Sequence, residues 1–146
     1  MKLPYKGGGV AIFQKDNTTG EYSILLGKRL NNPDRGKWSI PGGGYEKGDK
    51  NLNATALREF SEETELVLNS IILADKTYRW HLWIPFIFEW ETILCEIKED
   101  WHLADKRFHE FSEVRQIPLS ELKNYMLAFG VKSEVREFIR KNRMEA

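Results

Sequence analysis

The sequence contains one cysteine, Cys95, among its 146 residues. A lone cysteine forms no internal disulfide and no cysteine-based metal cluster, which fits a reducing compartment. Charges of the two signs are equally frequent, with 22 Lys and Arg residues against 22 Asp and Glu residues. The chain thus lacks the basic excess of many nucleic-acid-binding proteins, and the basic residues near its end are interpreted as a solvated helix face. We expect a cytoplasmic protein with no nucleic-acid partner.

Long hydrophobic stretches are also absent. The most apolar run, residues 82–88, contains Pro85 and is far too short to cross a bilayer. The first residues, MKLPYKGGG, lack the apolar region of a secretory signal peptide. We therefore expect no membrane partner. With 41% hydrophobic and 30% charged residues, the composition is that of one globular domain, which we place at residues 1–146.

Short β segments and helices follow one another without the regular spacing of βαβ units. Alternation and turn signals predict β segments at 7–14, 23–29, 38–40, 70–78, 80–96 and 113–117. Helical periodicity predicts helices at 51–65, at 120–127 with Ser120 as its cap, and from Ser133 or the turn before it. This order is typical of the α+β class, with a mixed sheet flanked by helices.

The segment 80–96 has apolar residues at every second position from Trp80 to Trp90, whereas the positions between them are mixed. This alternation predicts a single half-buried strand. Pro85 lies inside the segment and has no backbone N–H, so we expect an edge position or a β-bulge there.

The helix predicted at 51–65 carries a crowded acidic face. Arg58 and Glu62 are neighbours at i,i+4, as are Glu59 and Glu63. These side chains lie roughly opposite the apolar stripe of the same helix. Like charges at this spacing destabilise a helix by roughly 0.2–0.5 kcal/mol per pair, whereas a bound divalent cation offsets the repulsion. A solvated acidic face with one ion pair is the alternative interpretation.

Three consecutive glycines, Gly42, Gly43 and Gly44, precede this helix. Glycine permits close approach of the backbone to a ligand, and free N–H groups at a helix start bind phosphate. A triple glycine alone indicates only a tight turn. Followed by the REFSEE segment at 58–63, it favours a site for a metal ion and a phosphate.

The region from Gly43 to Leu66 resembles the signature of the Nudix hydrolases of the MutT type. That signature is a Gly, five residues, a Glu, seven residues and then R-E-U-x-E-E-x-G-U, where U is a bulky aliphatic residue. The segment REFSEETEL at 58–66 matches its second half, with Phe at the first U. Flanking segments, GKWSIPGGG and HEFSEVRQIPLSEL, are also similar to the family.

The chain departs from the family pattern at two places. A signature that starts at Gly43 puts Asp49 at the first Glu position, with one extra residue before Arg58. A start at Gly44 would put Lys50 there, and we prefer Asp49 because loops accept insertions and the acid is kept. Glu65 replaces the family glycine, so the helix either runs on or ends at a left-handed residue, which costs roughly 1 kcal/mol.

The resemblance implies a Nudix-type α/β/α sandwich around a mixed sheet. It also implies a pyrophosphohydrolase that uses Mg²⁺ or Mn²⁺ to hydrolyse a nucleoside diphosphate linked to another moiety, with water attacking a phosphorus. The substrate partner would be a small-molecule nucleotide, either a nucleoside triphosphate, ADP-ribose or a nucleotide sugar. A homodimer is compatible with this interpretation.

Residue roles follow from the resemblance by position. The metal ligands would be the carboxylates of Glu59, Glu62 and Glu63 and the carbonyl group of Gly43. Glu62 would act as a ligand or as a base, and Arg58 would hold the glutamates in place. Glu110, in the loop before the closing strand, corresponds to a further acid of the family, and a solvated loop glutamate is its alternative interpretation.

Substrate contacts are assigned to two regions. Arg29 and the glycines 42–44 would contact the phosphates. His81 and Trp83, on the mixed face of the aromatic strand, are the candidates for stacking on the base. The alternative is that these aromatic residues cover the sheet or belong to the core.

Two other activities share the fold that the resemblance implies. A Nudix-fold module that binds a nucleotide without cleaving it usually lacks one or more of the acids, and this chain keeps them all. Isopentenyl diphosphate isomerase uses a cysteine ahead of the signature, whereas Cys95 follows it. The sequence therefore favours a hydrolase.

Overall fold

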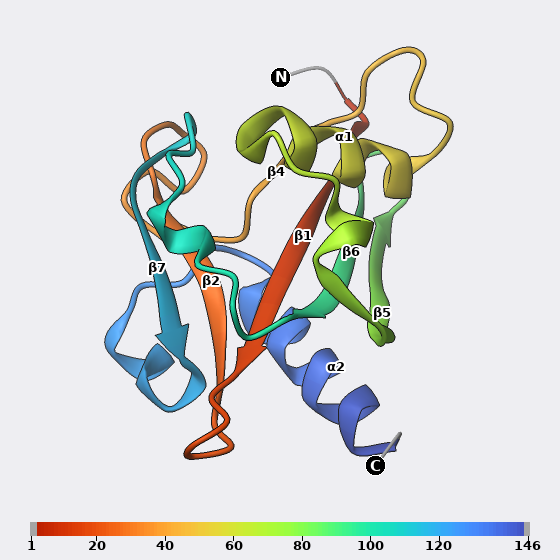
Figure 1. Ribbon diagram of the computed structural model, residues 1–146. Helices are drawn as coiled ribbons and strands as arrows, with labels where there is room; N and C mark the ends of the chain where they lie inside the picture. Colours follow the sequence, from red (N-terminus) through yellow and green to blue (C-terminus); the bar gives the residue numbers. More distant parts are fainter. Residues whose placement is uncertain (1–2, 145–146) are drawn as a thin grey trace.

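Strand β1 (Tyr5–Lys15) lies at the centre of a mixed sheet in the computed structural model, which describes residues 3–144. It pairs antiparallel with β2 (Tyr22–Arg29) and parallel with β6 (Phe88–Ile97). The strand order is β3, β2, β1, β6, β5, while β4 pairs with the first half of β1 and β7 pairs with β2 (Figure 1). The other elements are β3 (Trp38–Ser39), β4 (Gly42–Gly44), α1 (Leu52–Thr64), η1 (Leu68–Ser70), β5 (Ile72–Ile84), η2 (Leu103–Asp105), β7 (Phe111–Pro118), η3 (Leu119–Asn124) and α2 (Val131–Met144).

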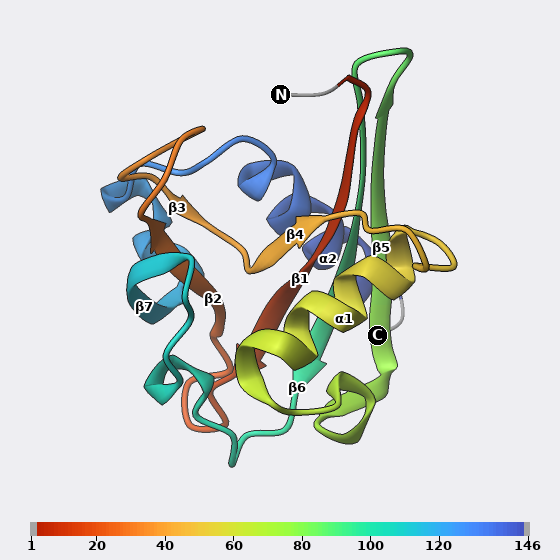
Figure 2. The same ribbon diagram turned by 90° about the horizontal axis from the view of Figure 1, so that it is seen from above.

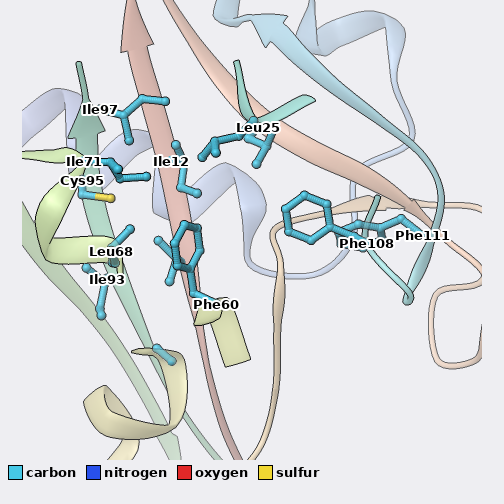
Figure 3. Close-up of a cluster of buried hydrophobic side chains, with 13 residues drawn as sticks. Ile12, Leu25, Phe60, Leu68, Ile71, Ile93, Cys95, Ile97, Phe108 and Phe111 are labelled. Atoms are coloured by element: carbon cyan, nitrogen blue, oxygen red, sulfur yellow. The ribbon is translucent and has the colours of Figure 1, made fainter. Parts of the chain in front are cut away.

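The two α-helices cover opposite faces of the sheet (Figure 2). Successive residues of a strand point to opposite faces, so Ile12 of β1 packs in the cluster under α1 whereas Phe13 packs in the cluster under α2. Phe13 stacks on Phe138 of α2, with ring centroids 3.8 Å apart. Figure 3 shows the cluster under α1, where Phe60 lies against the sheet and Cys95 is buried. The predicted α+β class and α/β/α sandwich are confirmed.

The glycines at the start of β1 let the layers come close together. A Cβ atom at Gly8 would lie 2.5 Å from the carbonyl oxygen of Leu52, at the start of α1. On the other face, a Cβ atom at Gly7 would lie 2.7 Å from the indole ring of Trp90. Side chains at these positions would therefore separate α1 and Trp90 from the strand.

The predicted single strand at 80–96 is wrong, because the chain reverses within it. Ile84 is paired with Phe88, and the N–H of Ile87 donates to the carbonyl oxygen of Ile84 at 3.0 Å. Phe86 has φ of 67° and is 88% exposed at the tip of the hairpin. Residues directly opposite each other in a hairpin share a face, so the even-numbered residues of 78–84 and 88–94 lie on one face and the alternation continues through the turn.

The ends of the helical segments also differ in detail from the prediction. Helix α1 ends at Thr64, and Glu65 takes the left-handed conformation with φ of 61°. Ser120 does not cap a helix: it lies in η3, which has no side-chain cap, and its hydroxyl donates to the carboxylate of Glu21. Helix α2 begins in the turn before Ser133, as one of the two alternatives predicted. Within residues 3–144, no helix is long and apolar enough to cross a membrane.

Candidate active site

The acidic face of α1 is set in place by the start of the helix and by its buried side. The side-chain oxygen of Asn51 accepts a hydrogen bond from the N–H of Ala54 at 2.8 Å and so caps the helix. Ala56, Phe60 and Thr64 are buried against the sheet. The carboxylates of the helix therefore lie on the sides that the sheet does not cover.

Arg58 organises these carboxylates. Its Nε and Nη2 atoms donate to the two oxygens of Asp49 at 2.9 and 3.0 Å. Its Nη1 atom lies 2.9 Å from Glu62, 3.1 Å from Glu59 and 2.9 Å from Glu46. The paired Arg58 guanidinium holds the pKa of Asp49 well below its usual range, and the pKa of Arg58 is raised in turn.

Asp49 has further contacts that fix it in the loop before α1. It accepts hydrogen bonds from the hydroxyl of Thr55 at 2.8 Å and from the N–H of Glu46 at 3.0 Å. Lys50, the other candidate for the first acid of the signature, is exposed. The geometry thus favours the alignment with Asp49 and the extra residue before Arg58.

The glycines expected to form a loop form strand β4 instead, paired with β1. The hydrogen bonds Val10 N–H to Pro41 and Tyr45 N–H to Lys6 flank the pair of Gly8 and Gly43. By the alternation of an antiparallel ladder, the Gly43 carbonyl group is directed at β1, where a Cβ atom at Gly7 would lie 2.6 Å from its oxygen.

Gly42 faces the other way. Its N–H donates to Oε1 of Glu110 at 3.1 Å, and its carbonyl group lies on the same side of the strand. The carbonyl group available to a metal ion is therefore that of Gly42 rather than that of Gly43. Gly43 contributes space, because a Cβ atom there would overlap the carboxylate of Glu59.

Glu63 and Glu110 bring α1 together with the segment before β7. Glu63 accepts a hydrogen bond from the N–H of His109 at 2.7 Å. Glu110 is largely buried, and the loss of solvent raises its pKa to about 7, with the nearby negative charge of Glu63 acting in the same direction. Partial burial also raises the pKa of Glu59 despite the Arg58 charge beside it.

A cavity of about 440 Å³ adjoins these acids on the α2 side of the sheet. Gly42, Gly43 and Glu110 form its polar end, together with Arg29, whose Nε donates to the carbonyl oxygen of Pro33 at 2.7 Å. Much of its wall is aromatic, with Tyr5, Trp80, Phe88, Trp90 and Phe129. Glu134, Ser39, Asp34 and a few apolar residues complete the wall.

His81 and Trp83 do not line this cavity, so the expected contact with the base is revised. Trp80 of the same strand does line it, and alternate residues of a strand point to opposite faces. His81 instead binds the carboxylate of Glu89 at 2.9 Å, and Trp83 is 64% exposed. The sequence does show that the even positions of this strand are apolar, but it predicts base stacking on the mixed face formed by the odd positions. Tyr5 and Glu134 were missed because no motif marks them.

The donor set fits a hard divalent cation in its chemistry, because it consists of carboxylate and backbone carbonyl oxygens. In residues 3–144, no three His, Cys, Asp or Glu side chains are gathered as a metal site. The reason is that Glu59 and Glu62 turn toward Arg58 while Glu63 turns toward His109. The missing side chain at Gly43 leaves the Glu59 carboxylate against the backbone of β4.

Comparison with known proteins places these features in a family. Residues 6–141 match the NUDIX domain. The ADP-ribose pyrophosphatase of Methanocaldococcus jannaschii is 30% identical over 135 residues, which cover 88% of this chain and 70% of that protein. The RNA pyrophosphohydrolase of Pelagibacter ubique is 36% identical over 67 residues, which cover 45% of this chain and 38% of that protein.

The fold is also that of a solved structure. A C. elegans Ap4A hydrolase superimposes with a TM-score of 0.71 over 95% of this chain and 98% of that chain, at 19% identity. With a pyrophosphatase and a pyrophosphohydrolase among its relatives, this chain belongs to the NUDIX domain family and groups with the hydrolases of phosphorus anhydrides.

Proposed function

We propose that this chain hydrolyses the diphosphate of an adenine nucleotide conjugate, with ADP-ribose as the first candidate and Mg²⁺ or Mn²⁺ as cofactor. One observation carries the proposal: the acidic face of α1 meets Gly42, Gly43 and Glu110 at the polar end of an aromatic cavity. The cavity is large enough for part of a nucleotide. The choice of adenine as the base is suggested by two similar proteins, an ADP-ribose pyrophosphatase and an Ap4A hydrolase.

Each residue has a part in this proposal. Glu59, Glu62, Glu63 and the Gly42 carbonyl group would hold the metal ion. When bound, the ion neutralises diphosphate charge and lowers the pKa of a bound water. Arg58 is a positioning residue, because it reaches the substrate side only through the carboxylates that it binds.

Two further residues face the place where the diphosphate would lie. Arg29 lines the polar end of the cavity and supplies positive charge for the phosphates. Glu110 lies beside it, and a carboxyl group with a pKa of about 7 takes up a proton near neutral pH. Glu110 is therefore suited to act as the general base for the attacking water, with Glu62 as the other candidate.

The test is a product assay with ADP-ribose, Ap4A, nucleoside triphosphates and nucleotide sugars, each with Mg²⁺ and with Mn²⁺. We expect ADP-ribose and water to give AMP and ribose 5-phosphate, and Glu63→Gln to reduce turnover at least tenfold. Glu99→Gln, an exposed acid outside the site, is the matched control and should keep its turnover. Asp49→Glu should change turnover less than Glu63→Gln does.

Different failures would have different meanings. Binding of AMP without turnover of any compound would identify a nucleotide-binding module in place of an enzyme. Undiminished turnover in Glu63→Gln would instead overturn the assignment of the metal ligands. A single domain over residues 1–146, a cytoplasmic location and a homodimer stay predictions from the sequence.

A further inference from the structure

Glu134 is a buried acid that the hydrolysis reaction does not use. It lies in the first turn of α2, is 2% exposed and lines the cavity. Its Oε2 atom accepts a hydrogen bond from the hydroxyl of Thr92, and that hydroxyl accepts one from Nε1 of Trp90 at 2.8 Å. These two hydrogen bonds, from Trp90 to Thr92 and from Thr92 to Glu134, do not involve the second carboxyl oxygen of Glu134.

The second oxygen, Oε1, lies beside the aromatic wall. A Cβ atom at Gly130 would be 3.7 Å from Oε1 and 3.5 Å from the indole ring of Trp80, so the two groups flank the same point. No hydrogen bond to Oε1 is formed by the residues between 3 and 144. The hydroxyl of Thr92 engages only Oε2 of Glu134, so Oε1 is left to the cavity that this side chain lines.

The protonation state of Glu134 decides which hydrogen bonds its carboxyl group can form. Burial raises the pKa of Glu134 to about 8, so the carboxyl group is mostly neutral at pH 7. With the hydroxyl of Thr92 donating to Oε2, the proton of the neutral acid is carried by Oε1. The cavity is thereby offered a hydrogen-bond donor next to the Trp80 ring.

A second polar group, the hydroxyl of Ser39, also lines the cavity. Ser39 of β3 is 8% exposed, and its hydroxyl finds no hydrogen-bond partner among the described residues. Flat aromatic walls with a few polar groups match a heteroaromatic ring, which stacks by its faces and forms hydrogen bonds by its edge.

We propose that Glu134 determines base specificity, recognising adenine by donating a hydrogen bond from its carboxyl group to the ring nitrogen N1. This inference rests on the proposed function for the identity of the base. N1 of adenine is an acceptor, whereas N1 of hypoxanthine carries a hydrogen, a donor that would face the donor of Glu134. The site should therefore distinguish two bases of nearly equal shape.

Other charged or titratable groups line the same cavity and define what a pH titration can report. They are Arg29 of β2, Asp34 of the following loop, Glu110 before β7 and the phenol of Tyr5 on β1. None of them is hydrogen-bonded to Glu134, whose neighbours Thr92, Trp90 and Trp80 are uncharged. AMP and IMP carry the same phosphate, so the ratio of their affinities cancels the effects of pH at the phosphate end.

The experiment measures AMP and IMP binding by calorimetry in EDTA, where no metal-dependent turnover occurs. At pH 6.5 the wild type should bind AMP at least about tenfold more tightly than IMP. Glu134→Leu should lose most of this preference, whereas Glu134→Gln, whose amide still donates, should keep it. Glu137→Gln, on the same helix but outside the cavity, is the control.

The pH series adds a readout that a merely structural role would not change. Between pH 6.5 and 8.5 the AMP preference of the wild type should fall, since ionised Glu134 accepts from IMP but cannot donate to AMP. The preference of Glu134→Gln should stay constant. Phe129→Ala, at an exposed position of the cavity wall, should weaken both ligands and tests the cavity if Glu134→Leu fails to fold.

An equal AMP preference in the wild type and in folded Glu134→Leu would overturn the inference, even if ADP-ribose is hydrolysed. Unchanged affinity for both ligands in Phe129→Ala would also overturn it, by placing the base elsewhere. Loss of the preference in Glu134→Leu without turnover by the wild type would support the inference and contradict the proposed hydrolysis. The experiments therefore distinguish a failure of the Glu134 proposal from a failure of the proposed hydrolysis.

Discussion

At the scale of single residues, Arg58 determines how the site is arranged without a ligand. Its guanidinium contacts four carboxylates, those of Asp49, Glu46, Glu59 and Glu62. Asp49 is bound by two nitrogens of the guanidinium, one at each carboxylate oxygen, whereas both oxygens of Glu62 share Nη1, so Asp49 fixes the position of Arg58. The bonds to Glu59 and Glu62 are the ones that a cation can replace, because they join side chains of the same acidic face.

Glu134 should make the stability of the protein depend on pH. Its pKa is about 8 in the folded state against 4.5 for a free side chain, so the folded state holds the proton more tightly. Between about pH 5 and 8 the unfolded chain releases this proton and the folded chain keeps it, so the free energy of unfolding falls as the pH rises. Glu134→Gln has no titrating proton at this position. Its free energy of unfolding should therefore rise relative to that of the wild type by on the order of 1 kcal/mol per pH unit in this window.

Urea denaturation at pH 5, 6.5 and 8 checks this expectation. Since both proteins share all other titrating groups, the difference between their unfolding free energies isolates Glu134. Parallel pH profiles would show that the folded protein does not hold the proton.

The residue types of the site could be predicted from the sequence, but not all of their directions. The acids of α1 follow from helical spacing, and they do lie on one side of the helix. The choice between Gly42 and Gly43 depends on which residue of β4 is hydrogen-bonded to β1. The choice between Trp80 and Trp83 depends on which face of β5 the helix α2 covers. The register of β4 against β1 and the face of β5 that α2 covers both depend on contacts between distant segments, so no local sequence pattern predicts them.

At the scale of elements, the contact between α1 and β1 requires Gly8. Gly8→Ala would put a Cβ atom 2.5 Å from the Leu52 carbonyl oxygen and 3.2 Å from the Ala56 nitrogen. The backbone of the helix must then move away, so we expect a loss of roughly 1–3 kcal/mol in the free energy of unfolding. Turnover should fall as well, because α1 carries the carboxylates.

The control for Gly8→Ala is Gly44→Ala, measured by the same denaturation curves. A Cβ atom at Gly44 meets nothing closer than the Tyr5 hydroxyl at 3.5 Å, an ordinary contact. The free energy of unfolding of Gly44→Ala should stay close to that of the wild type. Equal losses in the two variants would show that the closeness of α1 to β1 is not the cause.

The end of α1 offers a stabilising substitution. Glu65 is not a glycine but has φ of 61° and ψ of 19°, a conformation that glycine adopts without steric strain. Glu65→Gly should raise the free energy of unfolding by roughly 1 kcal/mol. Glu65→Ala removes the charge but keeps the Cβ atom, so it should not reproduce the gain. A similar gain in both variants would assign the effect to charge rather than to the backbone.

The elements that sequence analysis located correctly are those with a strong local signal, such as β1, β2 and both α-helices. It failed at the β5–β6 hairpin because the Ile84–Phe88 pair keeps the period of two through the turn. Only Pro85 interrupted the pattern, and it was interpreted as an edge or a bulge. Ser120 had the residue type of a helix cap, yet its hydroxyl is bound to Glu21, a residue 99 positions away. Distant contacts of this kind leave no local pattern.

At the scale of the whole molecule, a chain with no net charge concentrates negative charge in one place. Burial raises the pKa of Glu110 and of Glu59, the charges of Glu63 and Glu59 act on Glu110 in the same direction, and Arg58 compensates only part of this negative charge. The metal-free fold therefore carries unfavourable electrostatic energy at the site. A divalent cation should relieve it, and binding to the folded state alone raises the stability of the entire domain.

Metal removal should accordingly lower the melting temperature of the wild type. At a metal concentration one hundred times the dissociation constant, the stabilisation is about 2.7 kcal/mol, and EDTA should abolish it. Glu63→Gln should be at least as stable as the wild type in EDTA, because it loses a negative charge beside Glu110 and its amide oxygen still accepts from His109. With Mg²⁺ or Mn²⁺ the order should reverse, because the variant binds the cation more weakly. Calorimetric melting in EDTA and in each metal measures both orders, with Glu99→Gln expected to follow the wild type in each. Equal metal-induced shifts in the wild type and in Glu63→Gln would place the cation away from α1.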